Sequence, residues 1–155
     1  MKVGTISEHN AATVVVAGPG ERVFRLSDVA KAARVDCPDT VLGLVQACAQ
    51  DSNLISSLRM AVKNVNVPSV DAPNWLPPLP NPSKILGVAF NNKELMKKAH
   101  RDPGVPNFFM KPPSALQGHN KPIIVDPQWG AVIPEPEVCA VIGKRAKHIA
   151  DEQAL

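Results

Sequence analysis

Two acidic residues near the end of the chain, Glu135 and Glu137, are the side chains whose spacing best suits chemistry. Side chains two residues apart on a strand lie on one face of the sheet, roughly 6.6 Å apart. At that separation two ionised carboxylates repel each other by roughly 2–3 kcal/mol at an effective dielectric constant near 20. A divalent cation would offset this repulsion, and ligands that are all oxygen suit Mg²⁺, Mn²⁺ or Ca²⁺ better than zinc.

A bound metal is not the only way to accommodate the two acids. A raised pKa on one carboxyl group, or a neighbouring lysine or arginine, would relieve the repulsion as well. A solvated strand face would carry the two acids with no function at all. The spacing alone therefore defines a candidate site and leaves these alternatives open.

The element expected to position the two glutamates is a long strand over residues 131–143. Glu135, Glu137 and Cys139 would share one face of this strand, because side chains alternate between faces. The residues after Glu137 are apolar on both faces, which predicts that the strand runs into a core. Pro136 removes a backbone donor between the two acids and so implies a sheet edge or a bulge.

The elements before this strand are predicted from apolar runs and breaks. Residues 84–90 form a near-continuous apolar run, as expected for a buried strand. Residues 91–100 fit a short helix or a mobile loop, and the turn residues at 101–104 end that element. Short strands are predicted at residues 107–110 and 122–126.

The first part of the chain, residues 1–66, is predicted to be a small N-terminal α+β domain. Segments rich in β-branched residues predict strands at residues 2–6, 13–17 and 21–26, and the turn at residues 18–20 predicts a hairpin between the last two. Apolar residues at helical spacing follow. The predicted helices begin at Ser27, near Val41 and after Asp51.

A proline-rich segment, residues 67–83, separates this domain from the rest. Its six prolines exclude a regular helix or a central strand, so we expect an extended linker or a wrapping arm. Trp75 within it is expected to anchor the segment against a core. The predicted organisation is therefore a domain at residues 1–66, a linker at 67–83 and a second domain at 84–155.

Composition narrows the classes of partner. The formal net charge is +3, the basic residues are scattered, and the few aromatic residues are not interleaved with them, so no nucleic-acid partner is expected. No apolar run reaches the roughly 18 residues of a membrane span, and no signal sequence is visible. Three cysteines without a C-x-x-C spacing favour a reducing, cytoplasmic location over a disulfide framework.

Several motifs in the second half occur in an order that resembles the fumarylacetoacetate hydrolase superfamily. Residues 84–88 (KILGV) are similar to its first core strand, and residues 109–116 (FMKPPSAL) to its F-x-K-P-P-S-A-L motif. Residues 122–125 (PIIV) look like the next strand. Residues 135–145 (EPEVCAVIGKR) resemble its E-x-E-L-x-x-V-I-G-K-R strand.

The resemblance implies the beginning of a mixed-β catalytic core, the β-roll of the family, in a homodimer. It implies an enzyme acting on oxo-acids or β-dicarbonyl acids with Mg²⁺, or with Mn²⁺ or Ca²⁺, through a metal-bound enolate. Carried over, Glu135 and Glu137 are metal ligands. The third ligand, an aspartate, would lie beyond Leu155. Because residues 149–155 begin a helix without a closing signal, we expect the chain to be the N-terminal portion of a longer protein.

One catalytic feature of many family members is missing from this sequence. Their lid carries a G-x-N-Y-x-x-H-x-x-E pattern whose histidine and glutamate activate water. Counting from Gly87, Lys93 and Met96 stand in those two positions, and neither is a suitable base at neutral pH. His100 is a substitute only if the lid shifts. The catalytic residues are therefore not identified. C–C bond hydrolysis and hydratase, decarboxylase or isomerase chemistry all occur with this resemblance, and the missing dyad fits dehydration, hydration or tautomerisation of an oxo-acid better than hydrolysis by an attacking water.

Two further expectations follow from the resemblance. Lys111 lies in the motif that borders the active site, where its ammonium group could bind an anionic oxo-acid substrate. It could also simply end a strand before two prolines. The missing lid dyad leaves an alternative function open, that of a non-catalytic relative or a ligand-binding or assembly subunit.

Overall fold

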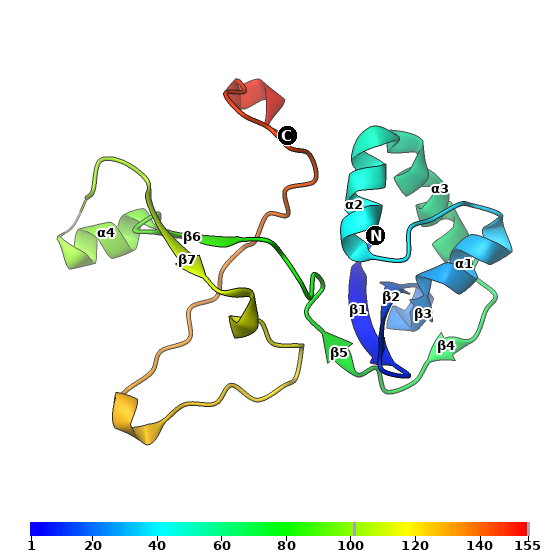
Figure 1. The fold of residues 1–155 in the computed structure, drawn as a ribbon, viewed down its shortest axis with the longest axis horizontal. Helices are drawn as coiled ribbons and strands as arrows, with labels where there is room; N and C mark the ends of the chain where they lie inside the picture. The colour runs from blue at the N-terminus through cyan, green and yellow to red at the C-terminus, as the bar shows by residue number, and fades with distance from the viewer. Residues whose placement is uncertain (101, 155) are drawn as a thin grey trace.

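The computed structural model describes residues 1–100 and 102–154. Its first half is built on an antiparallel sheet of five strands in the order β4-β3-β2-β1-β5 (Figure 1). The strands are β1 (Val3–Glu8), β2 (Ala11–Ala17), β3 (Val23–Arg25), β4 (Ser69–Val70) and β5 (Trp75–Leu76). The predicted α+β class is confirmed.

The central hairpin of this sheet joins β1 to β2. His9 and Asn10 form its tight turn, and both have a positive φ, at 49° and 64°. This conformation matches the twist of the two strands. Both strands extend to the turn, so they are longer than the sequence predicted. The hairpin that the sequence predicted, from β2 to β3, is also present, with β3 starting at Val23 instead of residue 21.

Three helices follow the sheet strands closely in sequence and pack on the sheet. They are α1 (Leu26–Ala33), α2 (Val41–Gln50) and α3 (Ser52–Lys63), at the positions predicted for them. Local capping explains the starts of α2 and α3: the Thr40 hydroxyl accepts a hydrogen bond from the Gly43 amide, and the Asp51 carboxylate accepts one from Asn53.

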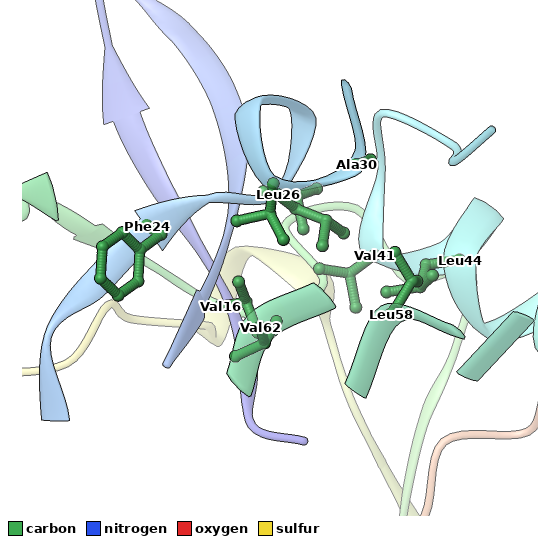
Figure 2. Close-up of a cluster of buried hydrophobic side chains, with 10 residues drawn as sticks. Val16, Phe24, Leu26, Ala30, Val41, Leu44, Leu58 and Val62 are labelled. Atoms are coloured by element: carbon green, nitrogen blue, oxygen red, sulfur yellow. The ribbon is translucent and has the colours of Figure 1, made fainter. Parts of the chain in front are cut away.

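The hydrophobic core lies between these helices and the sheet. Figure 2 shows side chains from β2, β3 and all three helices gathered together. Val16 and Leu58 are fully buried, at 0% exposure. The core residues are Val14, Val16, Phe24, Leu26, Val29, Ala30, Val41, Leu44, Leu58 and Val62.

The proline-rich segment wraps around this unit. Its two short strands lie at opposite edges of the sheet, β4 beside β3 and β5 beside β1. Trp75 packs so closely on Gly4 that a Cβ atom there would lie 2.9 Å from the ring. The Thr5 hydroxyl donates to the Pro78 carbonyl at 2.8 Å. We call residues 67–83 the arm.

The second half contains a two-stranded antiparallel ribbon. It pairs β6 (Ile85–Ala89) with β7 (Asn107–Lys111), and α4 (Lys93–Ala99) lies between them in sequence. The predicted strand positions are confirmed, but the burial predicted for the first strand is wrong. Leu86 is 57% exposed, because among the described residues no layer covers the ribbon.

The strands predicted at residues 122–126 and 131–143 are wrong. Between residues 112 and 154 the structure contains only short 3-10 turns, at Pro113–Ala115, Pro127–Trp129 and Asp151–Gln153. The physical reason is that a strand needs a neighbour to receive its backbone hydrogen bonds. Both segments are apolar and β-branched, yet neither pairs with another described segment (Figure 1).

No helix in residues 1–100 and 102–154 is both long and apolar enough to cross a membrane.

Candidate metal centre

The two glutamates singled out by the sequence lie in the unpaired segment 131–143. Both side chains are exposed, and no strand orders them on a common face. In the described part of the chain neither forms an ion pair. The segment approaches the rest of the molecule at its end, where Gly143 lies against Val45 of α2, close enough that a Cβ atom there would be 2.9 Å from the valine side chain.

The described residues supply two carboxylates here but do not complete a metal site. Residues 1–100 and 102–154 contain no group of three or more His, Cys, Asp or Glu side chains placed to share an ion. The donor type, two carboxylate oxygens, suits Mg²⁺ or Mn²⁺. The third ligand was expected beyond Leu155, and Leu155 itself lies outside the described residues.

Lys111 is the last residue of β7, opposite Ile85 of β6. Its side chain is exposed, and the Nζ atom lies 5.8 Å from the centre of the Phe109 ring. That contact is a cation–π interaction, which is weak at an exposed site. In the structure as described, Lys111 is not brought together with either glutamate by an ion pair.

Lys93 and Met96, which stand where the family lid has its histidine and glutamate, lie in the helix α4. This confirms the first of the two alternatives predicted for residues 91–100, a short helix or a loop. Lys93 is the first residue of α4, and Met96 is half-buried one turn later. The Asn92 side chain accepts a hydrogen bond from the Glu94 amide at 2.9 Å, which satisfies a donor at the start of the helix. His100 follows the helix with φ at 47°. The turn predicted at 101–104 includes Arg101, which lies outside the described residues.

The clearest electrostatic perturbations lie in the first half. A hydrogen bond from Arg25 to Glu8 lowers the pKa of the Glu8 carboxyl group and raises that of Arg25. Burial raises the pKa of the Cys37 thiol, with smaller contributions from Cys48 and Asp36. Burial also raises the pKa of Cys48. These are stabilising or packing features and not parts of the candidate metal centre.

Sequence reasoning missed a group of polar side chains beside the arm. Asn74 and Trp75 meet His119 and Lys121, which are 44 or more residues away in sequence, around an open hollow. Trp75 was expected only to be an anchor, and no function was predicted for His119 or Lys121. The feature of the sequence that could have indicated this contact is Gly118, whose lack of a side chain lets the two segments approach each other closely.

Comparison with known proteins supports the resemblance of the second half. Residues 84–155 match the family model described as fumarylacetoacetate (FAA) hydrolase C-terminal. An uncharacterized protein of Pyrococcus abyssi is 39% identical over 75 residues, and one of Pyrococcus horikoshii is 36% identical over 75 residues. Each alignment covers 48% of this chain and 33% of the relative, so the chain matches about a third of the length of these relatives. Residues 84–155 are therefore similar to the C-terminal domain of fumarylacetoacetate hydrolases.

Proposed function

We propose that this chain supplies part of a divalent-metal-dependent enzyme that acts on oxo-acids or β-dicarbonyl acids. The observation that carries the proposal is the family match over residues 84–155, which includes the E-x-E segment. Members of this superfamily are usually enzymes and typically depend on a divalent metal. The proposal includes a cytoplasmic homodimer with a small oxo-acid as substrate.

In this proposal Glu135 and Glu137 are two of the metal ligands. Their oxygen donors fit a hard cation. Because two carboxylates do not fill the six or more positions that such an ion takes, water, substrate oxygens or further protein groups would take the others. When bound, the cation would polarise the oxo group of the substrate and stabilise negative charge on it. The two glutamates would offset the charge of the cation and fix its position.

Lys111 is proposed to bind the carboxylate of the substrate. Its ammonium group has no carboxylate partner in the described residues, and it ends the strand that precedes the P-P-S-A-L stretch. An ammonium group meeting a carboxylate forms a charge-assisted hydrogen bond, which is stronger than a neutral one. In this role Lys111 orients the substrate and does not transfer a proton.

The reaction type is proposed to be dehydration, hydration or tautomerisation of an oxo-acid, in preference to hydrolysis. The observation behind this preference is that Lys93 and Met96 occupy the helical positions where a water-activating pair would stand. The same observation favours the second candidate, a non-catalytic relative that keeps the fold and binds a ligand or assembles with a partner.

Metal binding tests the assignment of the two glutamates directly. We expect the chain to bind Mn²⁺ weakly, with a Kd on the order of 1 mM or higher for two exposed carboxylates. The double variant Glu135→Gln/Glu137→Gln should lose this binding, measured by the relaxation rate of water protons. The matched control is Glu94→Gln/Glu152→Gln, which removes the same charge elsewhere. Equal Mn²⁺ binding by both double variants would contradict the assignment.

Turnover separates the two candidate functions. The protein with its metal should convert an acylpyruvate, oxaloacetate or a hydroxy-dienoate, or exchange the proton beside the oxo group of one of them with deuterium. Conversion that disappears in Glu135→Gln/Glu137→Gln supports the enzyme. Metal binding without conversion or exchange of any of these substrates favours the non-catalytic relative.

A further inference from the structure

A solvent-open hollow of about 340 Å³ lies between the arm and a turn of the second half. It is independent of the proposed metal centre, since neither glutamate lines it. Its walls come from two segments far apart in sequence. The lining residues are Ala72, Pro73, Asn74, Trp75, His119, Asn120 and Lys121.

Close backbone packing builds the hollow. Gly118 is buried against β5, and a Cβ atom there would overlap the carbonyl oxygen of Trp75, so only glycine fits. The chain then turns, with the Lys121 amide donating to the Gly118 carbonyl at 3.1 Å. Asn120 in this turn has φ at 60°, a left-handed conformation that asparagine tolerates better than most residues.

Side chains from the two segments are also in contact. The Lys121 Nζ atom donates a hydrogen bond to the Asn74 side-chain oxygen at 2.7 Å. The Trp75 and His119 rings meet edge to face, with 6.4 Å between their centres and 80° between their planes. The hollow is therefore held by contacts on both sides and is not a gap between unconnected loops.

The chemistry of the lining is that of an anion site with an apolar wall. No acidic residue lines the hollow, and in the described residues Lys121 forms no ion pair. A lysine ammonium has three donors; Asn74 takes one, which leaves two for a ligand. The His119 ring and the Asn120 amide add donors, while Trp75 and Pro73 offer apolar surface.

We propose that this hollow binds a small organic carboxylate with a flat apolar body. The carboxylate group meets the ammonium of Lys121 and the ring of His119, and the body lies against Trp75. Both parts are needed, because the charge alone is solvated by water at an open site and the apolar contact alone is small. The site does not depend on the proposed metal chemistry.

Trp75 provides its own reporter for the test. The chain has two tryptophans, so Trp129→Phe leaves Trp75 as the only one. Benzoate is the probe, with acetate (charge without the ring) and benzyl alcohol (ring without the charge) as matched probes. We expect a saturable, one-to-one change of Trp75 fluorescence with benzoate, at a Kd on the order of 1 mM for so small a ligand. Acetate and benzyl alcohol should bind at least roughly tenfold more weakly.

Variants of the lining residue Lys121 test whether benzoate binds in this hollow. Lys121→Met in the Trp129→Phe background should weaken benzoate binding at least roughly tenfold, while Lys121→Arg should retain it. Lys97→Met, which removes an exposed lysine of α4, is the control and should change nothing. Circular dichroism checks that each variant keeps the helices of the first half.

Three results would overturn the proposal. The first is an absence of saturable benzoate binding to the folded protein. The second is equal benzoate binding by Lys121→Met and the control. The third is binding of inorganic phosphate or acetate as tight as that of benzoate, which would indicate a general anion site without the apolar component.

Discussion

At the scale of single residues, an ion pair in the first half joins two strands that are not neighbours in the sheet. Glu8 ends β1 and Arg25 ends β3, so the pair reaches across β2, with Arg25 Nε donating to Glu8 at 2.8 Å. Asp28 of α1 lies 3.8 Å from the same guanidinium group. The contact therefore links two strands and the first helix.

This ion pair makes the free energy of unfolding depend on pH in the acid range. The pKa of Glu8 is lower in the folded protein than its unfolded value of about 4.3. Its contribution is therefore present above that value and is lost as pH falls through the lowered folded pKa. Glu8→Gln should lower the unfolding free energy at pH 7 by at most about 1 kcal/mol, because the pair is partly exposed. It should also flatten the acid dependence.

Urea unfolding followed by circular dichroism, repeated between neutral pH and acid, measures this effect. Glu21→Gln is the matched control, since Glu21 is exposed in the turn before β3 and forms no ion pair in the described chain. An acid dependence that is the same in Glu8→Gln and in the control would exclude this pair as its cause.

At the scale of elements, helices and strands differ in how much a sequence can say about them. The helices of the first half were predicted because their starts are local: Thr40 and Asp51 cap helices within three residues of themselves. A strand depends on a partner elsewhere. Residues 107–111 found one in β6, whereas 131–143, with the same kind of apolar pattern, found none in the described chain.

The same difference between local and distant determinants applies to the candidate metal site. The type and spacing of Glu135 and Glu137 could be read from the sequence, together with the choice of oxygen-binding metals. Their common face could not, because it assumed a strand that the described chain does not form. The hollow beside Trp75 escaped prediction for a related reason, since it depends on a contact between Gly118 and β5 across more than forty residues.

Thr40 offers a test at this scale. Thr40→Ala removes the hydroxyl that accepts the Gly43 amide, and it should lower the unfolding free energy by about 1 kcal/mol. Thr40→Ser should restore most of that loss, because serine caps equally well. Urea unfolding measures the free energy of unfolding of the parent protein and of the two variants. A Thr40→Ala variant as stable as the parent would show that the cap is not needed for α2.

At the scale of the whole molecule, the two halves differ in how they are held together. The first half buries a core between a sheet and three helices, while large apolar side chains of the second half face solvent. Ile124 is 86% exposed and Val138 is 101% exposed. Only the first half should therefore unfold cooperatively, because cooperative unfolding requires a shared core.

Hydrogen exchange detected by mass spectrometry can measure this contrast. Amides of β1, β2 and α3 should exchange slowly, at rates set by unfolding of the core, and amides of residues 131–143 should exchange within seconds. Residues 107–111 should lie between these limits. Slow exchange over residues 131–143 that weakens on dilution would instead indicate that a second chain pairs with this segment.

The arm has a consequence for how the protein meets its neighbours. Unpaired strand edges invite other chains to add to a sheet. By placing β4 on one edge and β5 on the other, the arm occupies both edges of the five-stranded sheet with two-residue strands flanked by prolines, which are poor templates for extension. In the described chain no short strand covers the outer edges of β6 and β7. We therefore expect strands of other chains to pair with the second half of this protein and not with the first.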